Sequence, residues 1–169
     1  GLQRGRYRSI GINRNDFLSL IQMRPDQPED AAVIQWLAFA SNAFNVLVPF
    51  YATIDTTPDY FSSTTREVTT DSFYWVSRMI GAMADASYKS SIFHIERYQE
   101  RVMSKGHEYI NQYDELLSKE SNAEERMQLR QEANEKIADM VKKETQDTLN
   151  KVLYELSNQM KNAYSRSDA

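Results

Sequence analysis

The sequence predicts an α+β protein in which a short antiparallel β-section precedes two or three long helices. All four prolines lie before residue 70, and none follows. Residues 1–68 contain β-favourable runs separated by turn residues, whereas apolar residues recur at helical spacing over residues 69–169. A chain of 169 residues has the length of one ordinary domain. We therefore expect 1–68 to be a β-rich segment and 69–169 a long-helix segment of the same domain.

The first predicted strands lie near the N-terminus. Residues 9–12 alternate polar and apolar side chains, and residues 17–23 form a β-favourable run. That run ends at the strand breaker Arg24-Pro25-Asp26-Gln27-Pro28.

A long uncharged stretch follows over residues 31–54. Its length would allow it to cross a bilayer. However, the polar residues Gln35, Asn42 and Asn45 interrupt the stretch, and Ser41-Asn42 is a natural turn. We therefore predict two strands over 33–40 and 44–51, each buried on both faces, and no membrane partner.

The helical pattern begins after Thr69-Thr70-Asp71, which can cap the first free N–H groups of a helix. The pattern predicts a kink or restart at 88–91 and a weak point at Gly106. Ser121-Asn122 is expected to form the turn and N-cap before a last helix that could exceed 40 residues.

Composition excludes several kinds of chemistry. The chain has no cysteine, so it can supply neither a disulfide nor a cysteine nucleophile, and it has only two histidines. His94 and His107 lie thirteen residues apart, on nearly opposite faces of a continuous helix, so we predict no metal site and no cofactor. An isoelectric point of about 5.3 and the absence of a basic stripe argue against a nucleic-acid partner. The absence of an apolar signal segment favours a cytoplasmic location.

Two segments place polar side chains beside apolar β-like runs. Residues 11–15 contain Asn13, Arg14 and Asn15, and Asn45 heads the apolar run that ends at residue 51. A buried arginine or asparagine requires hydrogen-bond partners, because leaving it unpaired costs a few kcal/mol. Each of these residues is therefore either a member of a structural network or a substrate anchor.

These segments carry a resemblance to a known family. The blocks 9–15, 35–38, 45–51 and 56–60, together with 71–75 and 157–162, resemble in order the C-terminal part of bacterial cysteine dipeptidases of the dipeptidase A type. That family belongs to the N-terminal-nucleophile hydrolases, which are built on a four-layer αββα sandwich. The resemblance implies that the β-section is part of such a sandwich and that the chain is a fragment of a larger catalytic domain.

The resemblance also implies a mechanism that this chain cannot complete. An N-terminal cysteine would attack the peptide carbonyl with its own α-amino group as base. Because the chain has no cysteine, the nucleophile is expected on a missing N-terminal part, and this chain alone is expected to be inactive. Dipeptides, that missing part and further copies of the protein are the partners we expect.

Four residues are candidates for binding the substrate. Arg14 is the first, because a planar guanidinium suits bidentate binding of a carboxylate. Asn13 and Asn15 would lie on the opposite face of a strand from Arg14, and Asn45 would join the same polar network. The alternative function is a non-enzymatic helical interaction or oligomerisation module, indicated by the amphipathic stripes of the second half.

Overall fold

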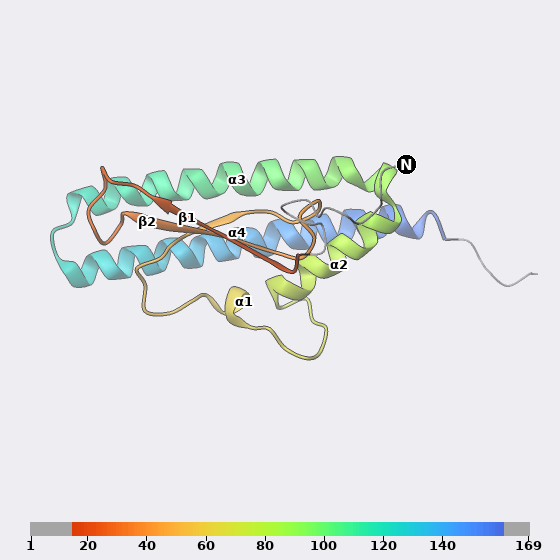
Figure 1. Ribbon diagram of the computed structural model, residues 1–169, viewed down its shortest axis with the longest axis horizontal. Coiled ribbons are helices and arrows are strands. Elements are labelled where there is room, and N and C mark those ends of the chain that lie inside the picture. The colour runs from red at the N-terminus through yellow and green to blue at the C-terminus, as the bar shows by residue number, and fades with distance from the viewer. Residues whose placement is uncertain (1–14, 161–169) are drawn as a thin grey trace, which may run out of the picture.

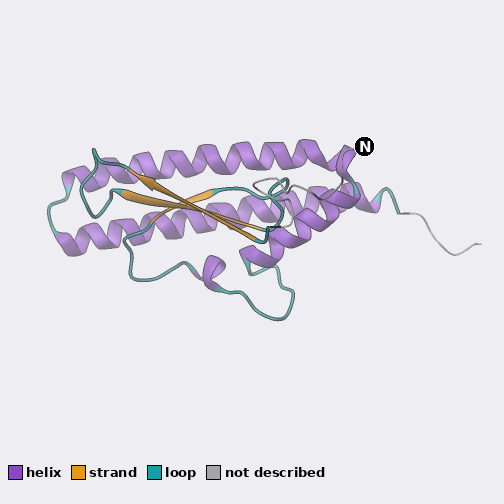
Figure 2. Cartoon of the chain, viewed as in Figure 1, coloured by secondary structure: helices purple, strands orange, loops and turns teal. Residues whose placement is uncertain are grey.

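A computed structural model describes residues 15–160 of the chain, in which a small sheet lies against a long helical hairpin (Figure 1). Figure 2 shows the same arrangement by secondary structure. The elements follow in the order β1 (Phe17–Met23), β2 (Val33–Phe39), β3 (Val48–Tyr51), α1 (Asp59–Ser62), α2 (Phe73–Ala86), α3 (Tyr88–Lys119) and α4 (Ala123–Ser157). The α+β class predicted from the sequence is confirmed.

The three strands form an antiparallel sheet in the order β1-β2-β3. The strand predicted at 17–23 is confirmed at both ends, whereas the strand predicted at 44–51 is confined to β3. The chain leaves β2 at Ala40, which has a positive φ of 67°. Residues 42–44 then turn, so the chain rejoins the sheet only at Val48. The alternating run at 9–12 lies outside the described residues.

The two faces of the sheet differ in cover. Side chains at even positions of β2 point toward α3, where Trp36 packs on His107 with ring centroids 4.9 Å apart. Ile34 and Ala38 on the same face are buried, whereas the odd positions of β2 are only half-buried. The odd face is partly covered by α2, where Phe39 packs on Phe73 with ring centroids 5.6 Å apart. The expected burial on both faces is therefore confirmed for β3, whose four residues are all buried, and was wrong for β2, most of whose residues are only half-buried.

The helices begin and end close to the predicted points, with three corrections. The first correction concerns α2, which begins at Phe73 with Ser72 at its N-cap position, so Thr69-Thr70-Asp71 is not the cap. The predicted restart is confirmed, because Ser87 separates α2 from α3 with a non-helical backbone. Asn122 caps α4 by accepting from the N–H groups of Glu124 and Glu125.

The second and third corrections concern the long helices. At Gly106 the helix α3 continues without a break. A Cβ at this position would lie 2.8 Å from Cδ and Cγ of Pro49, so the glycine allows β3 to approach the helix closely. The last helix has 35 residues and ends at Ser157, so the expected length above 40 was wrong.

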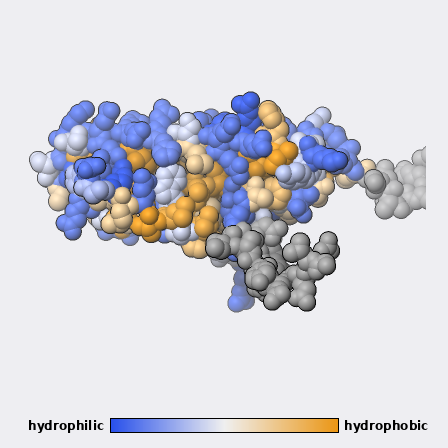
Figure 3. Space-filling view, turned by 45° about the horizontal axis from the view of Figure 1, so that its top comes forward, coloured by the Kyte–Doolittle hydropathy of each residue, from blue (hydrophilic) through white to orange (hydrophobic). Residues whose placement is uncertain are grey.

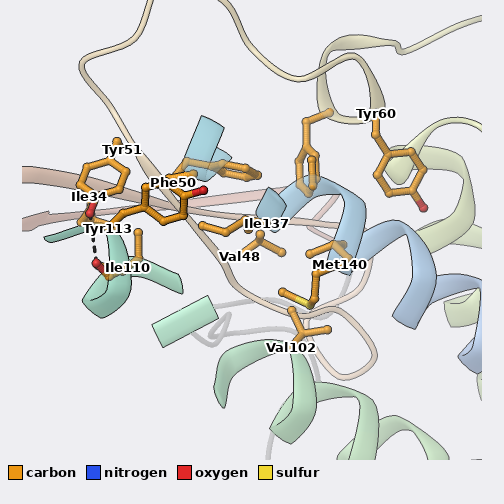
Figure 4. Close-up of a cluster of buried hydrophobic side chains, with 14 of the residues drawn as sticks. Ile34, Val48, Phe50, Tyr51, Tyr60, Val102, Ile110, Tyr113, Ile137 and Met140 are labelled. Carbon is orange, nitrogen blue, oxygen red and sulfur yellow. Dashed lines mark hydrogen bonds between the residues drawn. The ribbon is translucent and has the colours of Figure 1, made fainter. Parts of the chain in front are cut away.

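The main hydrophobic core lies between the sheet and the helical hairpin. Figure 4 shows Val48, Phe50 and Tyr51 of β3 surrounded by side chains of α3 and α4, with the Tyr51 hydroxyl donating to the carbonyl of Ile110 at 3.1 Å. A second, smaller cluster joins Phe44 to α2 and the far ends of α3 and α4. The sheet and both long helices thus share the larger of the two clusters, which contains all of β3 except Pro49.

Residues 31–54 contain β2, the turn and β3. No helix among residues 15–160 has the length and apolar character needed to cross a membrane.

Candidate functional site

A pocket of about 600 Å³ lies where β1 begins and β2 ends, against α2. Its wall includes Asn15, one of the four candidate residues from the sequence. Asn13 and Arg14 precede it directly in the chain and lie outside the described residues. The remaining wall residues are Asp16, Ala40, Ser41, Ala43, Phe44, Arg78, Gly81, Ala82, Asp85 and Tyr88.

The turn after β2 shapes this pocket, and Asn45 holds the turn. Asn45 is 8% exposed, and its Nδ2 donates to the carbonyl of Ala40 at 3.1 Å. Gln99 of α3 donates from Nε2 to the Asn45 carbonyl at 2.8 Å. The Ala40 N–H in turn donates to the Asp16 carbonyl at 3.0 Å. Asn45 thus connects the pocket wall with α3, and its buried amide is directed to the backbone of the turn.

The pocket combines charged groups with an apolar floor. Arg78 forms an ion pair with Asp16, and its guanidinium lies 5.6 Å from the centre of the Tyr74 ring. Asp85 is an exposed carboxylate two helical turns further along α2. Phe44 and Tyr88 contribute aromatic surface, with ring centroids 6.3 Å apart. A small ligand with separated positive and negative groups would find partners for both at this wall.

A buried asparagine that was not predicted from the sequence lies at the other end of the sheet. Asn134 of α4 is fully buried. Its Oδ1 accepts from the Tyr51 N–H at 2.9 Å, and its Nδ2 donates to the Tyr51 carbonyl at 3.0 Å. The signal was present in the sequence, because Asn134 stands three residues before Ile137 in the apolar stripe of α4.

Three ionic groups join elements that are distant in sequence. Asp30 accepts from Arg126 and Arg130, and the hydrogen bond from Arg126 is the main reason that the pKa of Asp30 is lowered. Arg24 pairs with Asp114, whose carboxylate also accepts from the Tyr51 hydroxyl at 2.8 Å. These two groups fix the β1–β2 turn on the helical hairpin.

The third ionic group lies between α3 and α4. Glu144 is 7% exposed and accepts from Nε of Arg101 at 2.7 Å and from Nζ of Lys105 at 2.6 Å. Burial alone raises the pKa of Glu144, but the two cations outweigh it and hold that pKa below the usual value. The sequence contains a signal for this group, because Glu144 is a charged residue three positions after Val141 in the apolar stripe of α4.

The two histidines lie in different surroundings. His107 packs on Trp36, whereas Nε2 of His94 lies 3.4 Å from a carboxylate oxygen of Glu155. Across residues 15–160, no group of three or more histidine, aspartate or glutamate side chains could hold a metal ion.

The described residues form an α+β fold in which a pocket of charged and apolar side chains lies at one end of a partly covered sheet. The sequence matches the model of peptidase family C69 over residues 2–101. This match spans more than half of the chain, so the chain belongs to peptidase family C69.

Relatives with names agree with this membership. The chain is 41% identical over 162 residues to a probable dipeptidase A of Streptococcus pyogenes serotype M1, an alignment that covers 96% of this chain and 33% of the relative. It is 36% identical to a dipeptidase of Bifidobacterium longum, with 96% of this chain and 37% of the relative covered. A dipeptidase A of Lactobacillus helveticus is 29% identical, over 90% and 32% respectively. The chain thus spans about a third of the length of these relatives.

Proposed function

We propose that this chain is the C-terminal portion of a dipeptidase whose nucleophile lies on a preceding part of the same protein. The observation that carries the proposal is the alignment of 96% of the chain with proteins named as dipeptidases. The covered fraction of those relatives, about a third, leaves most of each relative's length to carry the reacting groups.

The reaction we propose is hydrolysis of a dipeptide through an acyl-enzyme. The thiolate of an N-terminal cysteine attacks the peptide carbonyl carbon, and its α-amino group takes up the thiol proton. The C–N bond then breaks, the proton passes to the leaving amine, and a thioester remains. Water attacks the thioester carbonyl carbon, the C–S bond breaks to release the second product as a carboxylic acid, and the water proton passes through the α-amino group to the cysteine sulfur. The described chain contributes no thiol to these steps, so on its own it is expected to be inactive.

Under this proposal the chain supplies part of the substrate-binding wall. Arg14 would bind the dipeptide carboxylate, with Asn13 and Asn15 nearby. The position of Asn15 in the pocket wall supports this role. Asn45 would act through the turn, because its amide holds the Ala40 carbonyl. No cofactor is part of this chemistry.

We further propose that the three-strand sheet is one part of an αββα sandwich and that α3 and α4 form an outer helical layer. The half-covered face of the sheet supports this arrangement, since a second sheet needs an apolar face on which to pack. Segments 1–68 and 69–169 would then belong to one larger catalytic domain. A cytoplasmic location and a homo-oligomeric state complete the proposal.

Two substitutions in the full-length polypeptide test this function. Replacement of its N-terminal cysteine by alanine should abolish dipeptide hydrolysis, and undiminished activity would exclude the mechanism. Arg14→Ala should lower kcat/KM about tenfold or more, mainly through KM, because a charged hydrogen bond contributes about 1.5–3 kcal/mol. Arg66→Ala is the matched control, since Arg66 is an exposed arginine that does not line this pocket. Equal kinetics for the two arginine variants would remove Arg14 from the binding site.

A further inference from the structure

The two outer strands of the sheet differ in what their free edges offer. In an antiparallel ladder, alternate residues direct N–H and C=O groups away from the neighbouring strand. The Arg24 N–H donates to the Ala32 carbonyl and the Ala40 N–H to the Asp16 carbonyl, so the even positions of β1 face β2. The odd positions of β1 therefore point their backbone groups outward.

The edge of β3 is closed within the chain. The Ala52 N–H donates to the Val33 carbonyl, so Tyr51 and Pro49 are the residues of β3 that face outward. Asn134 takes both the N–H and the C=O of Tyr51, and Pro49 has no N–H to offer. Next along the chain, Arg130 donates to the carbonyl of Thr53 at 3.0 Å. No further strand can pair there.

The edge of β1 has none of these devices. Within residues 15–160, its only strand neighbour is β2, and its seven residues include no charge, proline or glycine. Native proteins usually protect a free edge with such residues, because a bare edge pairs with any available strand. The side chains beside the edge are apolar as well: Phe17 is 54% exposed, Ile21 59% and Met23 69%. Figure 3 shows apolar side chains gathered across one face of the molecule between hydrophilic flanks.

We propose that the outward edge of β1 is a strand-pairing site, and that its occupant is a β-strand from the preceding part of the same polypeptide. The chain spans only about a third of its relatives' length, which leaves ample polypeptide for such a strand. On the face of the sheet that carries Phe17 and Ile21, the side chains of this occupant strand have to be apolar and uncharged. This inference rests on the proposed placement of the chain within a longer dipeptidase.

Residue-resolved amide hydrogen exchange of the full-length polypeptide tests the proposal. The amides of Phe17, Ser19, Ile21 and Met23 should exchange within about tenfold of the rates at the inward amides of Leu18, Leu20 and Gln22. Fast exchange at the outward amides beside slow exchange at the inward ones would overturn it. This readout is independent of hydrolysis, so an inactive but protected protein would refute the proposed function and leave the paired edge standing.

A proline substitution gives a second readout in the same full-length protein. Ile21→Pro removes one outward N–H and no β1–β2 hydrogen bond, and a truly free edge tolerates proline. A paired edge loses a hydrogen bond, so Ile21→Pro should lower the melting temperature clearly below that of the side-chain control Ile21→Ala. Equal melting temperatures would overturn the proposal. Protection that depends on protein concentration, with a dimer that Ile21→Pro dissociates in analytical ultracentrifugation, would also overturn it, because the occupant would then be a second copy.

Discussion

The strands at the two edges of the sheet, β3 and β1, are both uncharged and mainly apolar but have different surroundings. Every residue of β3 is buried; Asn134 pairs with the outward N–H and C=O of Tyr51, and Pro49 has no N–H. Most residues of β1 are exposed, although the strand is as apolar as a core strand. The difference shows that the described residues complete the core around β3 and leave most of β1 exposed, which is the basis of the proposed strand-pairing site.

The electrostatic groups follow the same division. The paired carboxylates of Asp30, Asp114 and Glu144 join the helices to each other and to the β1–β2 turn, and their side chains are at most 31% exposed. The ion pair at the β1 end, Asp16 with Arg78, has side chains that are 62% and 42% exposed. Exposed pairs contribute little to stability, so this pair leaves the pocket end loosely fixed compared with the hairpin.

The largest effect on stability is expected at the outer edge of β3, where Asn134 pairs with the backbone of Tyr51. Asn134→Ala leaves the N–H and the C=O of Tyr51 buried without partners, each at a cost of about 1–3 kcal/mol. We therefore expect the free energy of unfolding to fall by about 2–5 kcal/mol in urea titrations. Gln22→Ala is the control, since the Gln22 side chain accepts an exposed hydrogen bond from Trp36 on β2. A loss for Asn134→Ala no greater than the control would show that the β3 edge is not closed by this amide.

The next effect separates two helical glycines. Gly106→Ala places a methyl group against Pro49 of β3 and should destabilise the protein by about 1–3 kcal/mol through overpacking. Gly81→Ala meets only Phe44, at 3.8 Å, so it should stabilise α2 by up to about 1 kcal/mol. Thermal unfolding of the two variants gives the comparison. If both substitutions stabilise the protein, β3 does not pack as closely on α3 as the structure indicates.

The features that were predicted correctly from the sequence are those that a short stretch of neighbouring residues determines. The β-run at 17–23, the break near Ser87 and the cap at Asn122 each depend on a few neighbouring residues, and all three are confirmed. Gly106 was misread as a weak point, because the contact that requires it comes from Pro49, far away in the chain. Asn134 and Glu144 were missed for the same reason: their partners lie on other elements.

The candidate site was predictable only in part. Asn15 and Asn45 were found by their place beside apolar runs; the structure places Asn15 in the pocket wall, and Asn45 donates to the carbonyl of Ala40, another residue of that wall. Their roles in substrate binding stay predictions. Arg78 and Asp85 were not found, since they lie on the exposed side of a helix where charged residues are ordinary.

A smaller effect is expected on the pH dependence of the unfolding free energy, through the ion pairs of Asp30 with Arg126 and Arg130. The pKa of Asp30 is lowered below 3.8, first through the hydrogen bond from Arg126. A lowered pKa adds stability that is present above pH 3.8 and is lost as the pH falls through the folded-state value. Unfolding free energies measured through this window should therefore decline less steeply in Asp30→Asn than in the unmodified chain. An equal slope in Asp30→Asn and the unmodified chain would contradict the assignment.

The smallest expected effect is on the bare edge itself, and one rung of the sheet provides its control. Ile21 pairs with Gln35, which pairs with Phe50, so Ile21 and Phe50 lie on the same face at opposite edges. In the 169-residue chain, Ile21→Lys should change the unfolding free energy by no more than about 0.5 kcal/mol, because its side chain is already exposed. Phe50→Lys should cost several times more, because Phe50 is 5% exposed and a lysine there would bury a charge. Similar losses for both variants would mean that β1 is covered as β3 is, and the contrast between the two edges would fail.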